Sequence, residues 1–224
     1  GLDPLTVRKR NFYSSENRNI TPYHMTVEDF VLDDIVEALE KSSDYWNRRE
    51  LIQQENNKNP VTRRGLALTP VKFGISFTAT WFNQAGALLH IYKDGSVHLN
   101  HGGTEMGQGL FTKVAQVVAT ALGLPIEQIK ISATRTDKVP NTSATAASSG
   151  ADLNAMAARN AAIVLKKRLS SFAAHHFKID TESLRFEDGK IDLGDQSISF
   201  SKLVELAYMN RVQLSATGFY RTPK

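Results

Sequence analysis

The chain has 224 residues, of which 41% are hydrophobic and 22% charged, and these fractions are typical of a globular protein with a sizeable core in one or two domains. The net charge of +4 and the shortness of the basic runs Arg8–Arg10 and Arg63–Arg64 argue against a nucleic-acid partner. The absence of cysteine excludes disulfides and iron–sulfur ligation by this chain, and it is compatible with a cytoplasmic location.

Two further absences concern membranes and targeting. No apolar run approaches the roughly 20 residues that cross a bilayer, and there is no signal peptide, so we expect no membrane partner. The sequence begins at Gly1 inside a helical or loop phrase and stops at Lys224 after a strand-like run. Both ends indicate a piece of a longer polypeptide.

Residues 1–58 are expected to form a mainly helical connecting segment. Thr26, followed by acidic residues, predicts a helix start, and a second helix is predicted from Tyr45 to Glu55. The polar run at residues 56–60 is the predicted boundary. Residues 59–224 then form the second expected domain.

Strand signals dominate the first part of this second domain. Gly65–Thr80 is rich in β-branched and aromatic residues and is predicted to be extended. Ala85–Tyr92 and Ser96–Asn100 flank a turn signal and predict a hairpin. Gln108–Leu122 repeats apolar residues at helical spacing, and Gly123 is expected to end that helix.

The remaining elements mix both types. The pattern predicts a short strand at 129–133, a long helix from Ser149 to His175, a hairpin at 185–193, a helix capped by Ser199 and a last strand at 213–220. Small residues along the long helix permit close packing against a neighbour. Because strict alternation of strand and helix is absent, the predicted class is α+β, with mixed sheets and packed helices.

The segment His101–Gly109 is the most informative stretch of the sequence. Its four glycines allow sharp turns and close backbone approach to a ligand. The helix that follows is expected to offer unpaired N–H groups to an electron-rich group, with the amide of Gln108 at its mouth. The glycine spacing does not match the dinucleotide-binding fingerprint, and by itself it is equally compatible with a simple turn.

A second small-residue stretch, Asn141–Asp152, also leads into a helix. Ser148 within it is a suitable N-cap residue. We expect the two stretches to face each other across one polar ligand.

Together these stretches resemble the molybdopterin-binding domain of the xanthine dehydrogenase and aldehyde oxidase family, on the xanthine dehydrogenase side. The resemblance extends to five further segments, at residues 72–78, 83–88, 94–96, 136–142 and 214–223. It covers most of the chain and is most specific from about Val71 to Asp152. It implies that the fold is part of that domain and that the cofactor is molybdenum–molybdopterin.

The resemblance also implies roles for individual residues. It assigns cofactor binding to Gly107, Gln108, Ala147 and Ser148, and substrate binding to Phe77, Thr78, Ala146 and Ala147. No catalytic residue and no protein ligand to a metal are expected in this chain. His101 and Glu105 could suggest a metal site, but they lack a second spaced pair.

Phe77 has two open interpretations. By pattern it is a core aromatic in a strand, whereas the resemblance places it against a planar substrate. Strand alternation would put Phe77 and Thr78 on opposite faces, so both could line one pocket only at a strand end or bulge.

Several family segments are missing: the glycine-phenylalanine loop, the substrate-recognising arginine loop and the segment bearing the glutamate base. The resemblance therefore implies a fragment of a cytoplasmic enzyme that oxidises purines and is inactive alone. Its expected partners are the purine, the rest of the molybdenum domain and a domain or subunit with [2Fe-2S] clusters and FAD, in an oligomer. The alternatives are an aldehyde oxidase or other N-heterocycle hydroxylase, and a non-catalytic structural module.

Overall fold

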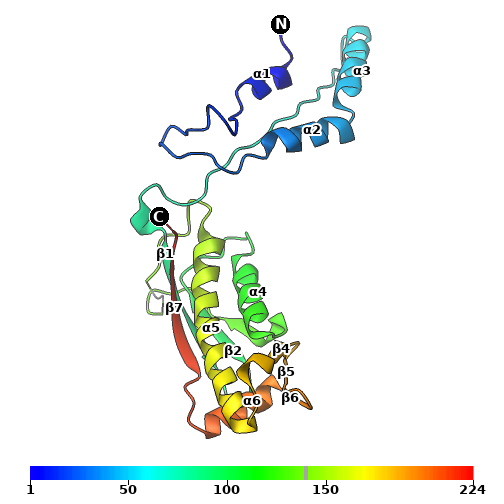
Figure 1. Ribbon diagram of the computed structural model, residues 1–224. Helices are drawn as coiled ribbons and strands as arrows, with labels where there is room; N and C mark the ends of the chain where they lie inside the picture. The colour runs from blue at the N-terminus through cyan, green and yellow to red at the C-terminus, as the bar shows by residue number, and fades with distance from the viewer. Residues whose placement is uncertain (139–140, 224) are drawn as a thin grey trace. The chain divides into compact units, whose positions relative to one another are not determined.

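The computed structural model describes residues 1–138 and 141–223 (Figure 1). Val139 and Pro140, which belong to the family-like segment at 136–142, lie outside the described residues. The chain divides into two compact units, Gly1–Phe73 and Gly74–Lys224. The boundary expected after residue 58 coincides with the end of a helix, and residues 59–73 group with the first unit.

The first unit contains three helices, α1 (Pro4–Arg10), α2 (Leu32–Ser42) and α3 (Tyr45–Lys58). They surround a small core of Leu5, Val36, Tyr45 and Leu68. Asp3 caps α1 by accepting a 2.7 Å hydrogen bond from the Leu5 N–H, and Pro4 occupies the first turn, where no N–H is needed.

The helix start predicted at Thr26 is wrong, because α2 begins at Leu32. Thr26 instead pairs with Ile20 in an isolated antiparallel bridge. The N–H of Val27 donates to the carbonyl of Asn19 at 2.7 Å, so the local backbone bonds close a turn before a helix can start. The helix predicted from Tyr45 is confirmed.

A four-stranded sheet, ordered β3-β2-β1-β7, organises the second unit. Its strands are β1 (Gln84–Ile91), β2 (Val97–His101), β3 (Ile129–Ile131) and β7 (Ser215–Arg221). β1 runs antiparallel to both β2 and β7, whereas β2 and β3 are parallel. The predicted hairpin of β1 and β2 is confirmed, with a positive φ at Gly95 in its turn.

Two helices, α4 (Leu110–Leu122) and α5 (Gly150–Phe177), pack against each other, and α5 covers β1 and β7 (Figure 1). A Cβ atom at Gly218 of β7 would lie 2.0 Å from the carbonyl oxygen of Ala157 in α5. The small residues of α5 therefore do allow the close packing that the sequence predicts. None of the helices in the described ranges combines the length and hydropathy that a bilayer crossing requires.

The rest of the second unit is a small sheet and one helix. β4 (Arg185–Glu187), β5 (Lys190–Asp192) and β6 (Ser197–Ser199) form an antiparallel sheet, and α6 (Phe200–Met209) follows it directly. Short 3-10 turns occur at Thr80–Phe82 (η1), Ile126–Gln128 (η2) and Thr181–Ser183 (η3). The predicted α+β class is confirmed, as are the end of α4 at Gly123 and the cap of α6 by Ser199.

The extended strand predicted over Gly65–Thr80 is wrong. Within this described stretch the only regular element is the start of η1. Val71, Phe73 and Ile75 are 75%, 72% and 62% exposed. A β-rich composition makes a strand only where a partner strand supplies backbone hydrogen bonds, and here the Ser76 N–H bonds instead to the carbonyl of Ala147, at 2.9 Å.

Candidate functional site

The two predicted loops lie side by side at the starts of α4 and α5. The glycine loop (His101–Gly109) leaves β2 and enters α4, and the alanine loop (Asn141–Ser149) enters α5. They are joined directly, because the Thr104 N–H donates to the Thr145 hydroxyl at 2.8 Å. The helix starts also touch, since a Cβ atom at Gly150 would lie 3.7 Å from Leu110 Cδ2. The two loops are therefore adjacent, as expected, and the polar ligand between them stays a prediction.

A cavity of about 400 Å³ opens between these loops, and we call it the loop cavity. Its lining residues are Met106, Gln108, Leu110, Lys113, Thr145, Ala146, Ser148, Gly150 and Ala151. Gln108, Ala146 and Ser148 among the predicted site residues thus share one cavity. Gly107 and Ala147 are not in its lining, although each neighbours a lining residue in the chain.

Glu105 occupies the start of α4. Its Oε1 accepts hydrogen bonds from the N–H groups of Gly107 and Gly109, at 2.9 and 3.0 Å, and its Oε2 accepts from the Phe111 N–H at 3.0 Å. The bond from Phe111, followed by those from the glycines, holds the pKa of this carboxyl below its ordinary value. The expectation that α4 offers unpaired N–H groups to a ligand is wrong at these positions, because Glu105 already binds them.

Gln108 makes two bonds within its own loop. Its Oε1 accepts from the Met106 N–H at 2.6 Å, and its Nε2 donates to the carbonyl of Thr104 at 2.9 Å. A primary amide has two donor hydrogens and two acceptor lone pairs. One donor and one acceptor position therefore remain for a ligand in the loop cavity.

The start of α5 lacks the cap that α4 has. Its N-cap residue is Ser149, so the assignment of Ser148 as a cap is wrong. Ser149 makes no side-chain bond to the first turn, because its hydroxyl donates to the carbonyl of Ala146 at 3.0 Å. Ala147 and Ser148 both have left-handed backbone, with φ of 54° and 55°. The uncapped N–H groups and the dipole of a long helix favour an anionic ligand there.

The charged side chains around the loop cavity also favour an anionic ligand. Lys113, which the sequence interpretation missed, contributes a cation from the first turns of α4. Among the described residues that line the cavity there is no carboxylate. The signal for Lys113 was its place early in the predicted helix Gln108–Leu122, beside the loop that holds Gln108.

Phe77 and Thr78 do not line the loop cavity, and they do not lie in a strand. The buried side chain of Asn83 clamps the backbone of Phe77, accepting from its N–H at 2.8 Å and donating to its carbonyl at 2.7 Å. The Phe77 ring is half-buried and packs on Phe82, with ring centroids 5.4 Å apart, while Thr78 is exposed. Since this segment is not a strand, strand alternation does not restrict where the two side chains point.

Phe77 is nevertheless tied to the alanine loop. The residue before it, Ser76, donates its N–H to the carbonyl of Ala147. The four residues assigned to substrate binding therefore lie on two backbone segments joined by a hydrogen bond. The family resemblance implied that these four residues share a substrate site, but the backbone bond that joins the two segments was not visible from the sequence.

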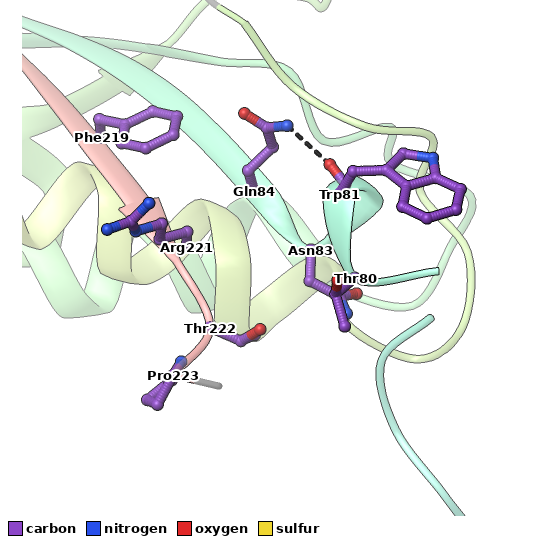
Figure 2. Close-up of a pocket in the computed structure, with 8 residues that line it drawn as sticks. All are labelled: Thr80, Trp81, Asn83, Gln84, Phe219, Arg221, Thr222 and Pro223. Atoms are coloured by element: carbon purple, nitrogen blue, oxygen red, sulfur yellow. Dashed lines mark hydrogen bonds between the residues drawn. The ribbon is translucent and has the colours of Figure 1, made fainter. Parts of the chain in front are cut away.

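A second cavity of about 490 Å³ lies at the start of β1 and the end of β7, and we call it the strand-end cavity (Figure 2). Its lining residues are Thr80, Trp81, Asn83, Gln84, Phe219, Arg221, Thr222 and Pro223. Gln84 pairs with Arg221 across the two strands and donates from Nε2 to the carbonyl of Trp81 at 2.6 Å. No part of this cavity was predicted as a site.

His101 is a buried structural group. Its Nδ1 accepts from the Gly103 N–H at 3.1 Å, and burial lowers its pKa to about 4, so the ring is neutral at pH 7. Its edge-to-face contact with Phe111 places the ring centroids 5.2 Å apart. In residues 1–138 and 141–223, no group of three or more His, Asp or Glu side chains could hold a metal ion.

The sequence and the fold match a known family. Residues 38–224 match the family described as the molybdopterin cofactor-binding domain, and the chain belongs to that family. Within it, the chain matches the corresponding part of xanthine dehydrogenases. It is 44% identical over 224 residues to a xanthine dehydrogenase from Blastobotrys adeninivorans and 44% identical over 223 residues to a xanthine dehydrogenase/oxidase from Gallus gallus.

In both comparisons the match covers 100% of this chain and 15% of the relative. The chain thus spans about a seventh of the length of these oxidoreductases. The fold is also that of a CO dehydrogenase from Oligotropha carboxidovorans, with a TM-score of 0.77 and 22% identity, covering 100% of this chain and 30% of that one.

Proposed function

We propose that the loop cavity holds part of a molybdenum–molybdopterin cofactor in a longer xanthine dehydrogenase. The main support for this proposal is that two small-residue loops join around one cavity. Lys113 lies on one side of this cavity, and the uncapped start of α5 lies on another. Molybdopterin carries the hydrogen-bonding ring edges of its pterin and, outside the ring, an anionic phosphate group. The cavity's donors, its cation and its small side chains suit both.

Individual residues then take definite roles. Gln108 hydrogen-bonds the cofactor with the donor and acceptor that its loop bonds leave over. Ser148 and the first-turn N–H groups of α5 bind its anionic part, and Gly107 and Ala147 allow the backbone to approach closely. When bound, the cofactor supplies the redox chemistry, and the chain's share is to bind it, orient it and exclude water.

The same proposal covers the substrate and the partners. Phe77 and Thr78, with Ala146 and Ala147, form part of a purine pocket, in which the Phe77 ring stacks on the planar substrate. Because the chain has no cysteine, the [2Fe-2S] clusters belong to other domains or subunits, as does FAD. The intact protein works in the cytoplasm as an oligomer.

The strand-end cavity suits contact with the rest of the longer protein. Trp81 and Phe219 are 69% and 49% exposed there, beside Arg221 and Pro223. A surface with two large exposed aromatic groups is typical of a face that another domain covers. We therefore assign it to the remainder of the molybdenum domain.

A paired substitution in the intact protein tests the cofactor assignment. Ala144 and Ala146 are both exposed alanines of the alanine loop, but only Ala146 lines the loop cavity. Ala146→Trp should fill the cavity and lower the molybdenum content, whereas Ala144→Trp should keep it. Equal molybdenum in the two variants, measured by elemental analysis, would remove the cofactor from this cavity.

The runner-up function is that of an aldehyde oxidase or another N-heterocycle hydroxylase. It uses the same cofactor site, so rates with purines, aldehydes and N-heterocycles on the intact protein separate the two. A non-catalytic structural module would bind no molybdenum at all. The 44% identity to xanthine dehydrogenases favours the purine enzyme.

A further inference from the structure

The carboxylate of Glu105 accepts three backbone hydrogen bonds, from Gly107, Gly109 and Phe111. By comparison, Asp3, which caps α1, accepts only one such bond from the first turn of that helix. Two of the three donors of Glu105 are glycines with φ of 97° and 74°. Glycine loses the most conformational freedom on ordering, so such a loop needs strong contacts to keep one conformation.

Gln108 stands between the two glycines that Glu105 holds. The N–H groups on both sides of it, those of Gly107 and Gly109, bond to the same oxygen, Oε1 of Glu105. Oε2 bonds to Phe111 in the first turn of α4 and so ties the loop to the helix. The backbone of Gln108 is thereby fixed from both directions, while its side chain lines the loop cavity.

We infer that Glu105 is a positioning residue, which presets the glycine loop so that Gln108 meets the cofactor in one orientation. This inference rests on the proposed function of the loop cavity. Glu105 also takes the place at α4 that a ligand anion would otherwise occupy. The anionic end of a ligand is thereby directed towards Lys113 and the uncapped start of α5.

A charged acceptor is needed for this role. A carboxylate has two oxygens that accept, and a helix start favours negative charge. Glutamine at this position keeps one accepting oxygen for the glycines, but its NH₂ group cannot accept from the Phe111 N–H. Alanine removes all three bonds.

The test uses the intact protein with the variants Glu105→Ala, Glu105→Gln and Gln108→Ala. The control is Ser199→Ala, because Ser199 caps α6 by accepting from the Lys202 N–H at 3.1 Å and lines no part of the loop cavity. Two quantities are measured: hydrogen exchange of peptides spanning residues 104–111 in cofactor-free protein, and molybdenum retained after dialysis.

In Glu105→Ala we expect loop exchange to rise and cofactor affinity to fall by at least about tenfold, which is the size expected for the loss of a single charge-assisted hydrogen bond out of the three. Glu105→Gln should be intermediate in both, and Ser199→Ala should match the parent in both. Loss of either helix cap, Glu105 at α4 or Ser199 at α6, lowers general stability. Recovery of loop order and molybdenum in Glu105→Gln, relative to Glu105→Ala, therefore identifies the positioning role.

Two results would overturn the inference. Unchanged loop exchange in Glu105→Ala would show that the three bonds do not order the loop. Faster exchange with unchanged molybdenum would show that the order does not serve the cofactor. In the second case a loss of molybdenum in Gln108→Ala would leave the proposed function standing, whereas full molybdenum in both variants would remove it too.

Discussion

Replacing Gln108 by alanine in the intact protein should lower cofactor retention more than it lowers thermal stability. The side chain makes two neutral hydrogen bonds within an exposed loop, at 2.6 and 2.9 Å. Each such bond stabilises by roughly 0.5–1.5 kcal/mol, so the loop loses about 1–3 kcal/mol of local order. Exposed loops open independently of the core, and the unfolding midpoint should therefore change little.

We expect the affinity for the cofactor to fall by more than the thermal stability of the protein. Each ligand hydrogen bond that disappears weakens affinity by about two- to tenfold, and a disordered loop adds to this because the ligand must then order it. Molybdenum retained after dialysis and the unfolding midpoint are measured on the same preparations.

Gln116→Ala is the matched control. Gln116 is an exposed glutamine of α4 with one weak side-chain bond, 3.3 Å to Thr120, and it lies outside the loop cavity. It should retain molybdenum like the parent. Equal retention in the Gln108 and Gln116 variants would refute the role of Gln108 as a cofactor ligand.

Three further predictions concern substrate, packing and pH. Phe77→Leu should lower kcat/KM about threefold to tenfold with molybdenum content intact; an unchanged kcat/KM beside a lower unfolding midpoint would make Phe77 a packing residue only. Gly218→Ala should destabilise by about 1–3 kcal/mol or more, because its Cβ would lie 2.0 Å from the Ala157 carbonyl, whereas Gly65→Ala, with open space around it, should be neutral in the same thermal unfolding experiment. Since the folded pKa of Glu105 is lowered, its stabilising effect on the loop is fully present above the ordinary glutamate pKa of about 4.3 and is lost as the pH falls through the lowered pKa. The difference in the hydrogen-exchange protection factors of residues 104–111 between parent and Glu105→Gln should therefore be constant at neutral pH and shrink in acid. A difference that stays constant into acid would contradict this.

Local signals in the sequence predicted most of the second unit. Gly123 ends α4 with a φ of 69°, and Ser199 caps α6 through its hydroxyl. Such features depend on residues within one turn of each other, so a single sequence contains them. The alanines of α5 were likewise informative, because the helical spacing of small residues indicates close packing.

The errors have two physical causes: the lack of a pairing partner distant in the sequence, and local backbone turns that displace the start of a helix. Residues 65–79 have strand-like composition, but within residues 1–138 and 141–223 no strand pairs with them. The cap of α5 moved from Ser148 to Ser149 because the alanine loop takes up two left-handed residues before the helix begins.

The candidate site was predicted in outline. The pairing of the two loops was expected from their small residues and from the helix that each one enters, and Gln108, Ala146 and Ser148 do share one cavity. The role of Glu105 was not predicted, since its three bonds depend on how the glycines fold back. The strand-end cavity was missed because it is formed by residues more than 130 positions apart, Thr80 and Pro223 among them.

A crystal structure of the intact, cofactor-loaded protein would show whether the loop cavity holds the cofactor. We expect cofactor density between the glycine loop and the alanine loop, in hydrogen-bond contact with Gln108 and with the first turn of α5. Cofactor density that touches neither of these would remove the cofactor from the loop cavity.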